Sequence, residues 1–151
     1  MKVVVQRVSQ ASVKVDHKIT GKIGKGLLLL VAVHKNDGTE EMQWVADKIA
    51  KLRVFEDEEG KMNKSVLDIS GELLVVSQFT LYGEVKKGTR PSFIESAQPE
   101  KAEDLYDEMV QYWGNNYGID VETGRFAAMM DVSLVNDGPV TLIIEKNKKD
   151  E

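Results

Sequence analysis

Seven consecutive apolar residues, Leu27–Val33, are the feature that most restricts how this chain can fold. Such a run has no polar face to turn toward water, so it predicts a strand that is covered on both sides in the middle of a sheet. A second continuous run, Leu73–Val76, follows the break at Ser70-Gly71. The same reasoning makes it a second buried strand.

The remaining pattern alternates between strands and helices. Further strands are predicted at residues 2–9, 13–15, 19–23, 53–55, 119–122, 129–135 and 140–145. One helix is predicted to follow Asp37-Gly-Thr-Glu40, which has capping-box spacing, and to bury a stripe of Met42, Val45, Ala46, Ile49 and Leu52. A second helix is predicted to start near Pro99, to end at 114–116, and to bury Ala102, Leu105, Tyr106, Met109 and Trp113. This order predicts one mixed α/β domain over residues 1–145 and a charged, frayed tail at 146–151.

Composition excludes several classes of protein. No apolar stretch is long enough for a membrane span, and the N-terminus turns polar too early for a signal peptide, so we expect a cytoplasmic protein without membrane contact. Cysteine is absent, which excludes disulfides and a thiol nucleophile. The net charge of −5 disfavours broad, non-specific binding of nucleic acid. Two local basic clusters remain: Lys86, Lys87 and Arg90, and Lys146, Lys148 and Lys149 in the tail.

Polar residues follow the second apolar run without a loss of β propensity. If the strand continues to Leu81, Ser77 and Phe79 share one face, while Gln78 and Thr80 share the other. Polar groups at the end of a core strand must be hydrogen-bonded, face water or face a ligand. The segment is therefore either a strand that runs out to solvent or the wall of a binding site.

Asn136-Asp137-Gly138-Pro139 separates the last two predicted strands. Asp-Gly between β runs is typical of a tight hairpin turn, and Pro is permitted as the first residue of the next strand. The alternative is functional, because Gly and Pro make a stiff piece of backbone whose carbonyls can be presented to a ligand.

A conventional hydrolytic site is hard to assemble from these residues. A serine or threonine nucleophile needs a base, and the two histidines, His17 in a predicted turn and His34 at a strand end, have no sequence-level claim to that role. Two scattered histidines without cysteine also make a poor zinc site, so neither metal nor cofactor is expected. If the chain is an enzyme, backbone amides and the substrate's own groups must carry much of the chemistry.

Six segments, in this order, resemble the D-aminoacyl-tRNA deacylases over almost the whole chain. They are Gln6-Arg7-Val8, Gly60-Lys61-Met62-Asn63, Ser77-Gln78-Phe79-Thr80-Leu81, Arg90-Pro91-Ser92-Phe93, Thr123-Gly124-Arg125-Phe126, and Asn136-x-Gly138-Pro139-Val140-Thr141. The fold that the resemblance implies is a single α/β domain of β/β/α layers, in which mixed and antiparallel sheets form a barrel-like core with two main helices.

The resemblance also implies a function. A homodimer is expected to hydrolyse the ester of D-amino acids, and of glycine, on the acceptor end of tRNA, with no role for DNA. Ser77, Gln78 and Arg7 are expected to bind substrate, and Phe79 and Thr80 to be catalytic. Gly138 and Pro139, cis in the family, are expected to enter the other subunit's site and to exclude L-amino acids.

Two mechanisms remain open at this stage. In the first, the 2′-hydroxyl of the terminal adenosine assists a water molecule, and a backbone N–H near Phe79 stabilises the oxyanion. In the second, Thr80 is the nucleophile. Two other functions also stay open, namely an esterase for small metabolites and a non-catalytic ligand-binding dimer. The preferred amino acid and tRNA, the isomer of the Gly138–Pro139 bond and the role of the tail are not fixed by the residues.

Overall fold

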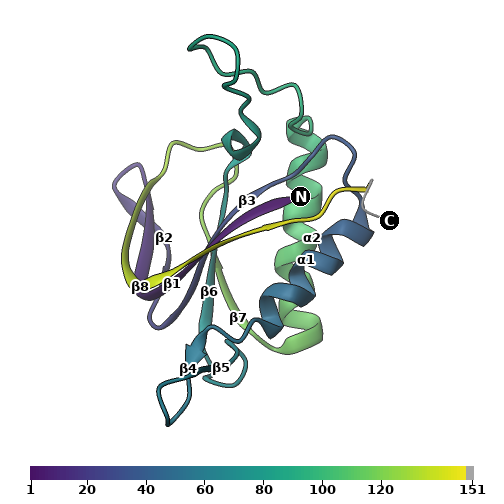
Figure 1. Cartoon of the computed structure of the whole chain (residues 1–151). Helices are drawn as coiled ribbons and strands as arrows, with labels where there is room; N and C mark the ends of the chain where they lie inside the picture. Colours follow the sequence, from purple (N-terminus) through teal and green to yellow (C-terminus); the bar gives the residue numbers. More distant parts are fainter. Residues whose placement is uncertain (149–151) are drawn as a thin grey trace.

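The computed structural model describes residues 1–148, and Figure 1 shows a twisted sheet with both helices on one side. The strands are β1 (Lys2–Val15), β2 (Lys18–Ile23), β3 (Gly26–Ala32), β4 (Phe55–Glu56), β5 (Met62–Lys64), β6 (Glu72–Ser77), β7 (Asp120–Thr123) and β8 (Asp131–Glu145). The main sheet has the order β2-β1-β3-β6-β7, and β8 pairs with β1. Because β3–β6 and β6–β7 are parallel and the other pairs antiparallel, the sheet is mixed, as predicted.

The sheet curls until its two ends approach each other. A Cβ atom added at Gly21 in β2 would lie 2.6 Å from the carbonyl oxygen of Thr123 in β7, so these strands nearly touch. Val8, Val13, Leu28 and Leu74 are among the buried residues inside the curl. The opposite faces of the same strands pack against the helices in a larger core. The predicted β/β/α layers and barrel-like core are therefore confirmed.

The first strand is longer than predicted. Residues 2–9 and 13–15 were expected to be separate strands, but β1 runs unbroken from Lys2 to Val15. Its pairing partner changes along its length: Val8 is the last residue opposite β3, and Ala11 is the first opposite β2. Ser9 and Gln10 are exposed where this change occurs, which explains why their polarity looked like a break.

The two helices follow the predicted stripes but not the predicted ends, and Leu52, predicted in the first stripe, is the half-buried residue that ends α1. Helix α1 (Thr39–Lys51) is capped by Gly38, whose N–H donates to Glu41 at 3.0 Å, so the capping box lies one residue later than expected. Asp37 instead binds the α-ammonium group of Met1. Helix α2 (Pro99–Tyr117) continues through 114–116, which were predicted to end it, and stops at Gly118 in the left-handed conformation. Within residues 1–148, neither helix is long and apolar enough to cross a membrane.

Short elements complete the domain. Strand β4 overlaps the predicted strand at 53–55 only at Phe55, and it forms a small hairpin with β5, a strand that the sequence pattern did not predict. Asp57 holds the turn between them by accepting from the N–H groups of Glu59 and Lys61 and from the side chain of Asn63. At the C-terminal end, Lys146 exchanges backbone hydrogen bonds with Met1, while the last three residues of the predicted tail lie outside the described part of the chain.

Candidate active site

The polar segment after β6 turns sharply instead of continuing as a strand. Strand β6 ends at Ser77, and Phe79–Tyr82 form a 3-10 turn, η1. Gln78 makes the transition: its N–H donates to the carbonyl of Val31 at 2.7 Å, and its carbonyl accepts from Leu81. The predicted alternation of faces from Ser77 to Leu81 is therefore wrong beyond Ser77.

This turn leaves backbone donors available at the end of a core strand. The first N–H groups of a helical turn have no acceptor within the turn, and Phe79 and Thr80 occupy those positions. Such groups form a suitable site for a negative charge that develops on a substrate oxygen. The expected oxyanion donor near Phe79 is thus geometrically possible.

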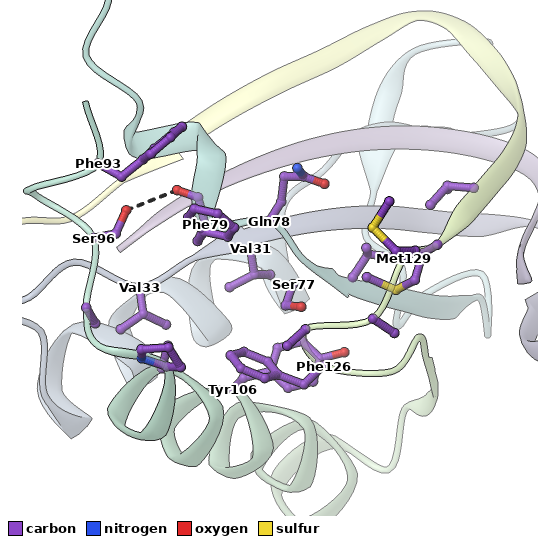
Figure 2. A pocket seen from close by; sticks show the side chains of 18 of the residues that line it. Val31, Val33, Ser77, Gln78, Phe79, Phe93, Ser96, Tyr106, Phe126 and Met129 are labelled. Atoms are coloured by element: carbon purple, nitrogen blue, oxygen red, sulfur yellow. Dashed lines mark hydrogen bonds between the residues drawn. The ribbon is translucent and has the colours of Figure 1, made fainter. Parts of the chain in front are cut away.

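A pocket of about 810 Å³ opens beside the turn. Figure 2 shows Ser77 in its lining, with Val31 and Val33 on one side and Tyr106 and Phe126 on another. The lining combines these apolar and aromatic side chains with the charged or polar groups of Lys14, Asp16, His17 and Asp131. A volume of this size lies within the range that holds small ligands of nucleoside size.

Two aromatic pairs shape the pocket. Phe79 and Phe93 meet edge to face with centroids 5.3 Å apart, and the Ser96 hydroxyl donates to the carbonyl of Phe79 at 3.2 Å (Figure 2). Tyr106 and Phe126 are 6.0 Å apart. The Tyr106 hydroxyl donates to the carbonyl of Val75 at 2.6 Å, and burial raises the pKa of this phenol above its usual value. Tyr106 therefore acts as a neutral, fixed part of the wall.

Neither histidine is placed to activate Thr80. The Thr80 hydroxyl lies 2.6 Å from the Gln78 side-chain nitrogen, which is its one recorded side-chain partner among residues 1–148. Both ring nitrogens of His34 are occupied, one by Glu95 at 2.8 Å and the other by the N–H of Asn36. The His34 contact lowers the pKa of the Glu95 carboxyl. His17 lines the pocket, but no hydrogen bond joins it to Thr80 within residues 1–148.

The Asn136–Pro139 segment is not a hairpin turn. Strand β8 passes through it, and both halves pair with β1, with Thr141 opposite Gln6 and Asn136 opposite Val8. Four residues, 137–140, therefore bulge opposite Arg7 alone. Gly138 and Pro139 are exposed and joined by a cis peptide bond.

The buried side chain of Arg7 binds the backbone of this bulge. It donates to the carbonyl of Val54 at 2.7 Å and reaches the carbonyls of Asp137 at 3.1 Å and Gly138 at 3.4 Å. It also pairs with the Asp137 carboxylate at 3.1 Å.

The structure thus divides the predicted site residues into two groups. Ser77, Gln78 and Phe79 line the pocket, and Thr80 lies in the same 3-10 turn as Phe79. Gly138 and Pro139 belong to a separate, exposed bulge that the buried Arg7 side chain binds, and none of these three residues lines the pocket of its own chain.

The family of the chain follows from comparison with known proteins. Residues 4–145 match the family model described as D-Tyr-tRNA(Tyr) deacylase. The chain belongs to this family. A D-aminoacyl-tRNA deacylase of Exiguobacterium sibiricum is 59% identical over 146 residues, covering 97% of this chain and all of the relative. One from Chloroherpeton thalassium is 55% identical over 151 residues, covering 100% of this chain and 99% of the relative.

Solved structures agree on the fold. A structure titled c-Myc DNA Unwinding Element Binding Protein has a TM-score of 0.92 and 42% identity, with 97% of this chain and 99% of that chain covered. A probable eukaryotic D-amino acid tRNA deacylase, only 18% identical, has a TM-score of 0.81 and covers 95% and 97% of the two chains. The predicted family is confirmed, and with it the enzyme class, a hydrolase of the aminoacyl-tRNA ester.

Several lining residues were not among the predicted site residues. Tyr106 was assigned to the buried stripe of a helix, because its spacing does not distinguish a core position from a pocket wall. Phe126, Met129 and Met130 come from the segment between β7 and β8. A sequence signal existed only for Phe126, which ends the quoted segment Thr123-Gly124-Arg125-Phe126.

Proposed function

We propose that this protein is a homodimeric deacylase that hydrolyses the ester of D-aminoacyl-tRNA and of mischarged glycyl-tRNA. The observation that carries the proposal is the separation of two parts within one chain. The pocket has polar lining residues at Ser77 and Gln78, whereas the exposed Gly138-Pro139 bulge is not part of that lining. In a homodimer, the bulge of each subunit completes the pocket of the other subunit.

The pocket suits the terminal adenosine. Tyr106, Phe126 and Met130 offer apolar and aromatic surface for a purine, which stacks on such side chains whatever its sequence context. Ser77 and Gln78 place polar groups at the rim, where the ribose and ester lie. Phe79 then holds the ester beside the start of η1.

The chemical step relies on the backbone and on the substrate. The N–H of Phe79 stabilises the oxyanion, and one such donor lowers the activation barrier by roughly 3–4 kcal/mol. The adenosine 2′-hydroxyl hydrogen-bonds to the attacking water and orients it. As the ester C–O bond breaks, a proton of that water passes to the leaving 3′-oxygen. Thr80 as nucleophile takes second place, because its recorded partner is the Gln78 amide, which is not a base.

Chirality is sorted by the partner's bulge. A hydrophobic pocket separates substrates that differ by one methylene group by only about 1–3 kcal/mol, whereas a rigid backbone that collides with one enantiomer rejects it. Arg7 acts here through positioning: it fixes the two carbonyls of the bulge. Glycine has no side chain to reject, so its ester is hydrolysed as well.

Strand β8 offers the surface for the second copy. Its other edge is unpaired within residues 1–148, and it exposes Val135, Leu142 and Ile143. An open strand edge with apolar side chains is a template for association. The Gly138-Pro139 bulge lies in the middle of this strand, so a second copy that associates along β8 also meets the bulge.

Hydrolysis of matched D-, L- and glycyl-tRNA by the purified protein tests the proposal, with its mass in solution measured in parallel. A dimer that deacylates the D and glycyl substrates and spares the L substrate is expected. Equal cleavage of simple amino-acid esters and aminoacyl-tRNA would favour a small-metabolite esterase. Absence of any hydrolysis would favour a ligand-binding dimer.

A further inference from the structure

The segment from Glu84 to Ser92 forms a basic loop at the edge of the pocket. It contains three cationic residues, Lys86, Lys87 and Arg90, and one acidic residue, whereas the net charge of the whole chain is −5. All three cations are exposed, and none takes part in an ion pair recorded within residues 1–148. The Glu84 carboxylate accepts from the backbone N–H of Lys86 at 2.8 Å. The loop therefore presents three cations to the surroundings.

The base of the basic loop is fixed to the pocket. Glu84 and Ser92 exchange backbone hydrogen bonds of 2.7 and 3.0 Å, which close the loop, and Figure 1 shows it projecting from the body beyond η1. A Cβ atom on Gly83 would lie 3.0 Å from both the Phe93 ring and the Thr80 carbonyl. Phe93 in turn packs on Phe79, so both ends of the loop start at the pocket rim.

This attachment limits how far the cations lie from the pocket. Lys86 is three residues from Gly83, and Arg90 is three residues from Phe93. An extended chain advances at most ~3.3–3.6 Å per residue, so the backbone of Lys86 and Arg90 is within about 11 Å of the rim, and that of Lys87, four residues from Gly83, within about 14 Å. Successive nucleotides of one strand are spaced ~3.4 Å along a helix axis. The backbone positions of the three cations thus fall within about three to four nucleotides of a base held in the pocket.

We infer that Lys86, Lys87 and Arg90 bind the backbone phosphates of the tRNA acceptor end, next to the terminal adenosine. The inference rests on the proposed function, because that function places the adenosine in the pocket. Charge complementarity favours a polyanion, and the acidic remainder of the chain disfavours contact over a broad area. The basic loop therefore gives the enzyme most of its affinity for the RNA while leaving the ester chemistry to the pocket.

The test uses a triple variant, Lys86→Gln, Lys87→Gln and Arg90→Gln. The matched control is Lys22→Gln, Lys51→Gln and Lys61→Gln, which removes three exposed charges elsewhere. Binding of deacylated tRNA is measured as a function of salt, and kcat/KM is measured on a D-aminoacyl-tRNA and on the same amino acid esterified to adenosine alone. Binding needs no catalysis, so it tests the loop even where hydrolysis fails.

Neutralising three phosphate contacts is expected to reduce the slope of log K against log salt by about two to three units. Between 50 and 200 mM salt, this corresponds to a change of about sixteen-fold to sixty-fold in the ratio of the two affinities. The adenosine ester, which lacks these phosphates, is expected to react equally with the triple variant, the control and the unaltered protein.

A triple variant with the slope of the unaltered protein would overturn the inference. So would equal losses on tRNA and on the adenosine ester, because the loop would then act on the pocket itself. If duplex DNA competes for the protein as strongly as tRNA does, the basic loop has a general affinity for nucleic acid and the specific contact with the acceptor end is refuted. Loop-dependent binding without hydrolysis by the unaltered protein would instead refute the deacylase function and leave the RNA contact standing.

Discussion

The Arg7 guanidinium donates to the carbonyl of Gly138 at 3.4 Å while it also binds the carbonyl of Asp137 and, at 2.7 Å, that of Val54. A single buried side chain thus joins the Asp137–Gly138 bulge of β8 to the residue that precedes β4. Arginine suits this task because its planar group directs several donors at once and keeps its charge. The geometry of the bulge is therefore set from inside the fold.

Replacing Arg7 is expected to loosen the bulge before it affects the pocket. Arg7→Ala leaves the buried carbonyl of Val54 and the partly buried carbonyls of the bulge without their donor, and it should lower the free energy of unfolding by about 2–3 kcal/mol. Arg7→Lys keeps the charge but not the planar donors, so stability should recover more fully than the D/L ratio. Denaturant unfolding and deacylation of D- and L-aminoacyl-tRNA measure the two effects, with exposed Arg53→Ala as the control. An unchanged D/L ratio in both Arg7 variants would show that the bulge holds its geometry unaided.

Thr80→Ala is expected to retain substantial activity. The Thr80 hydroxyl has the Gln78 amide as its recorded side-chain partner, so its loss removes one surface hydrogen bond and no nucleophile. Single-turnover deacylation of a D-aminoacyl-tRNA, with Thr80→Val as a variant of similar shape, provides the measurement. A loss of ~10⁴-fold or more in a folded protein would establish Thr80 as the nucleophile instead.

The four tyrosines predict the alkaline behaviour of the fold. Burial raises the pKa of Tyr82 and Tyr106, and hydrogen bonds to Asp47 raise those of Tyr112 and, to about 12, Tyr117. In the unfolded chain a tyrosine titrates near ~10. The folded state therefore holds more protons than the unfolded state above that pH, and stability must fall as pH rises.

Absorbance at 295 nm, which reports tyrosinate, measures this directly in native protein and in denaturant. Native protein is expected to show little tyrosinate at a pH where the unfolded chain has titrated, and then to unfold and ionise together. A tyrosine that ionises near ~10 in a protein that remains folded would contradict the burial and hydrogen bonding described above.

Local periodicity was sufficient for the parts of the fold that depend on burial alone. The buried residues of α2 are the five predicted, and the apolar runs Leu27–Val33 and Leu73–Val76 form the adjacent strands β3 and β6, apart from Val33. The prediction that the strand continues beyond Ser77 was wrong, because Phe79 and Leu81 alternate with polar residues as the residues of a strand do. The 3-10 turn arises from contacts with Val31, Phe93 and Ser96, which lie far away in sequence.

The bulge shows the same limit more clearly. Asp137-Gly138 has the local chemistry of a hairpin turn, but β8 continues past it because β1 offers an equally long partner on one side. Only the contact of Arg7 with the bulge distinguishes a continuous strand from a hairpin turn. Arg7 and Asp137, which make this contact, are 130 residues apart in the sequence. The residues of the site were recognised through their resemblance to a family, and their division between a pocket and a separate bulge required the structure.

The central claim is that Gly138-Pro139 sorts substrates by chirality in the facing subunit. A Cβ atom on Gly138 meets only the Asn136 side chain at 3.5 Å, an ordinary contact, so Gly138→Ala should fold normally. The added methyl group then acts on whatever the exposed bulge approaches. Gly114→Ala is the matched control, because no atom lies within 4 Å of its added Cβ.

The decisive measurement is the rate of deacylation of matched D-, L- and glycyl-tRNA by Gly138→Ala, after folding and dimerisation are confirmed. A changed D/L ratio is expected, through accepted L substrate or selectively lost D substrate, and an unchanged ratio is expected in the Gly114→Ala control. In mixed dimers, one unaltered bulge facing an unaltered pocket should restore discrimination at that pocket. Equal slowing on all three substrates would contradict the account, because the dipeptide would then be structural and the chiral filter would lie elsewhere.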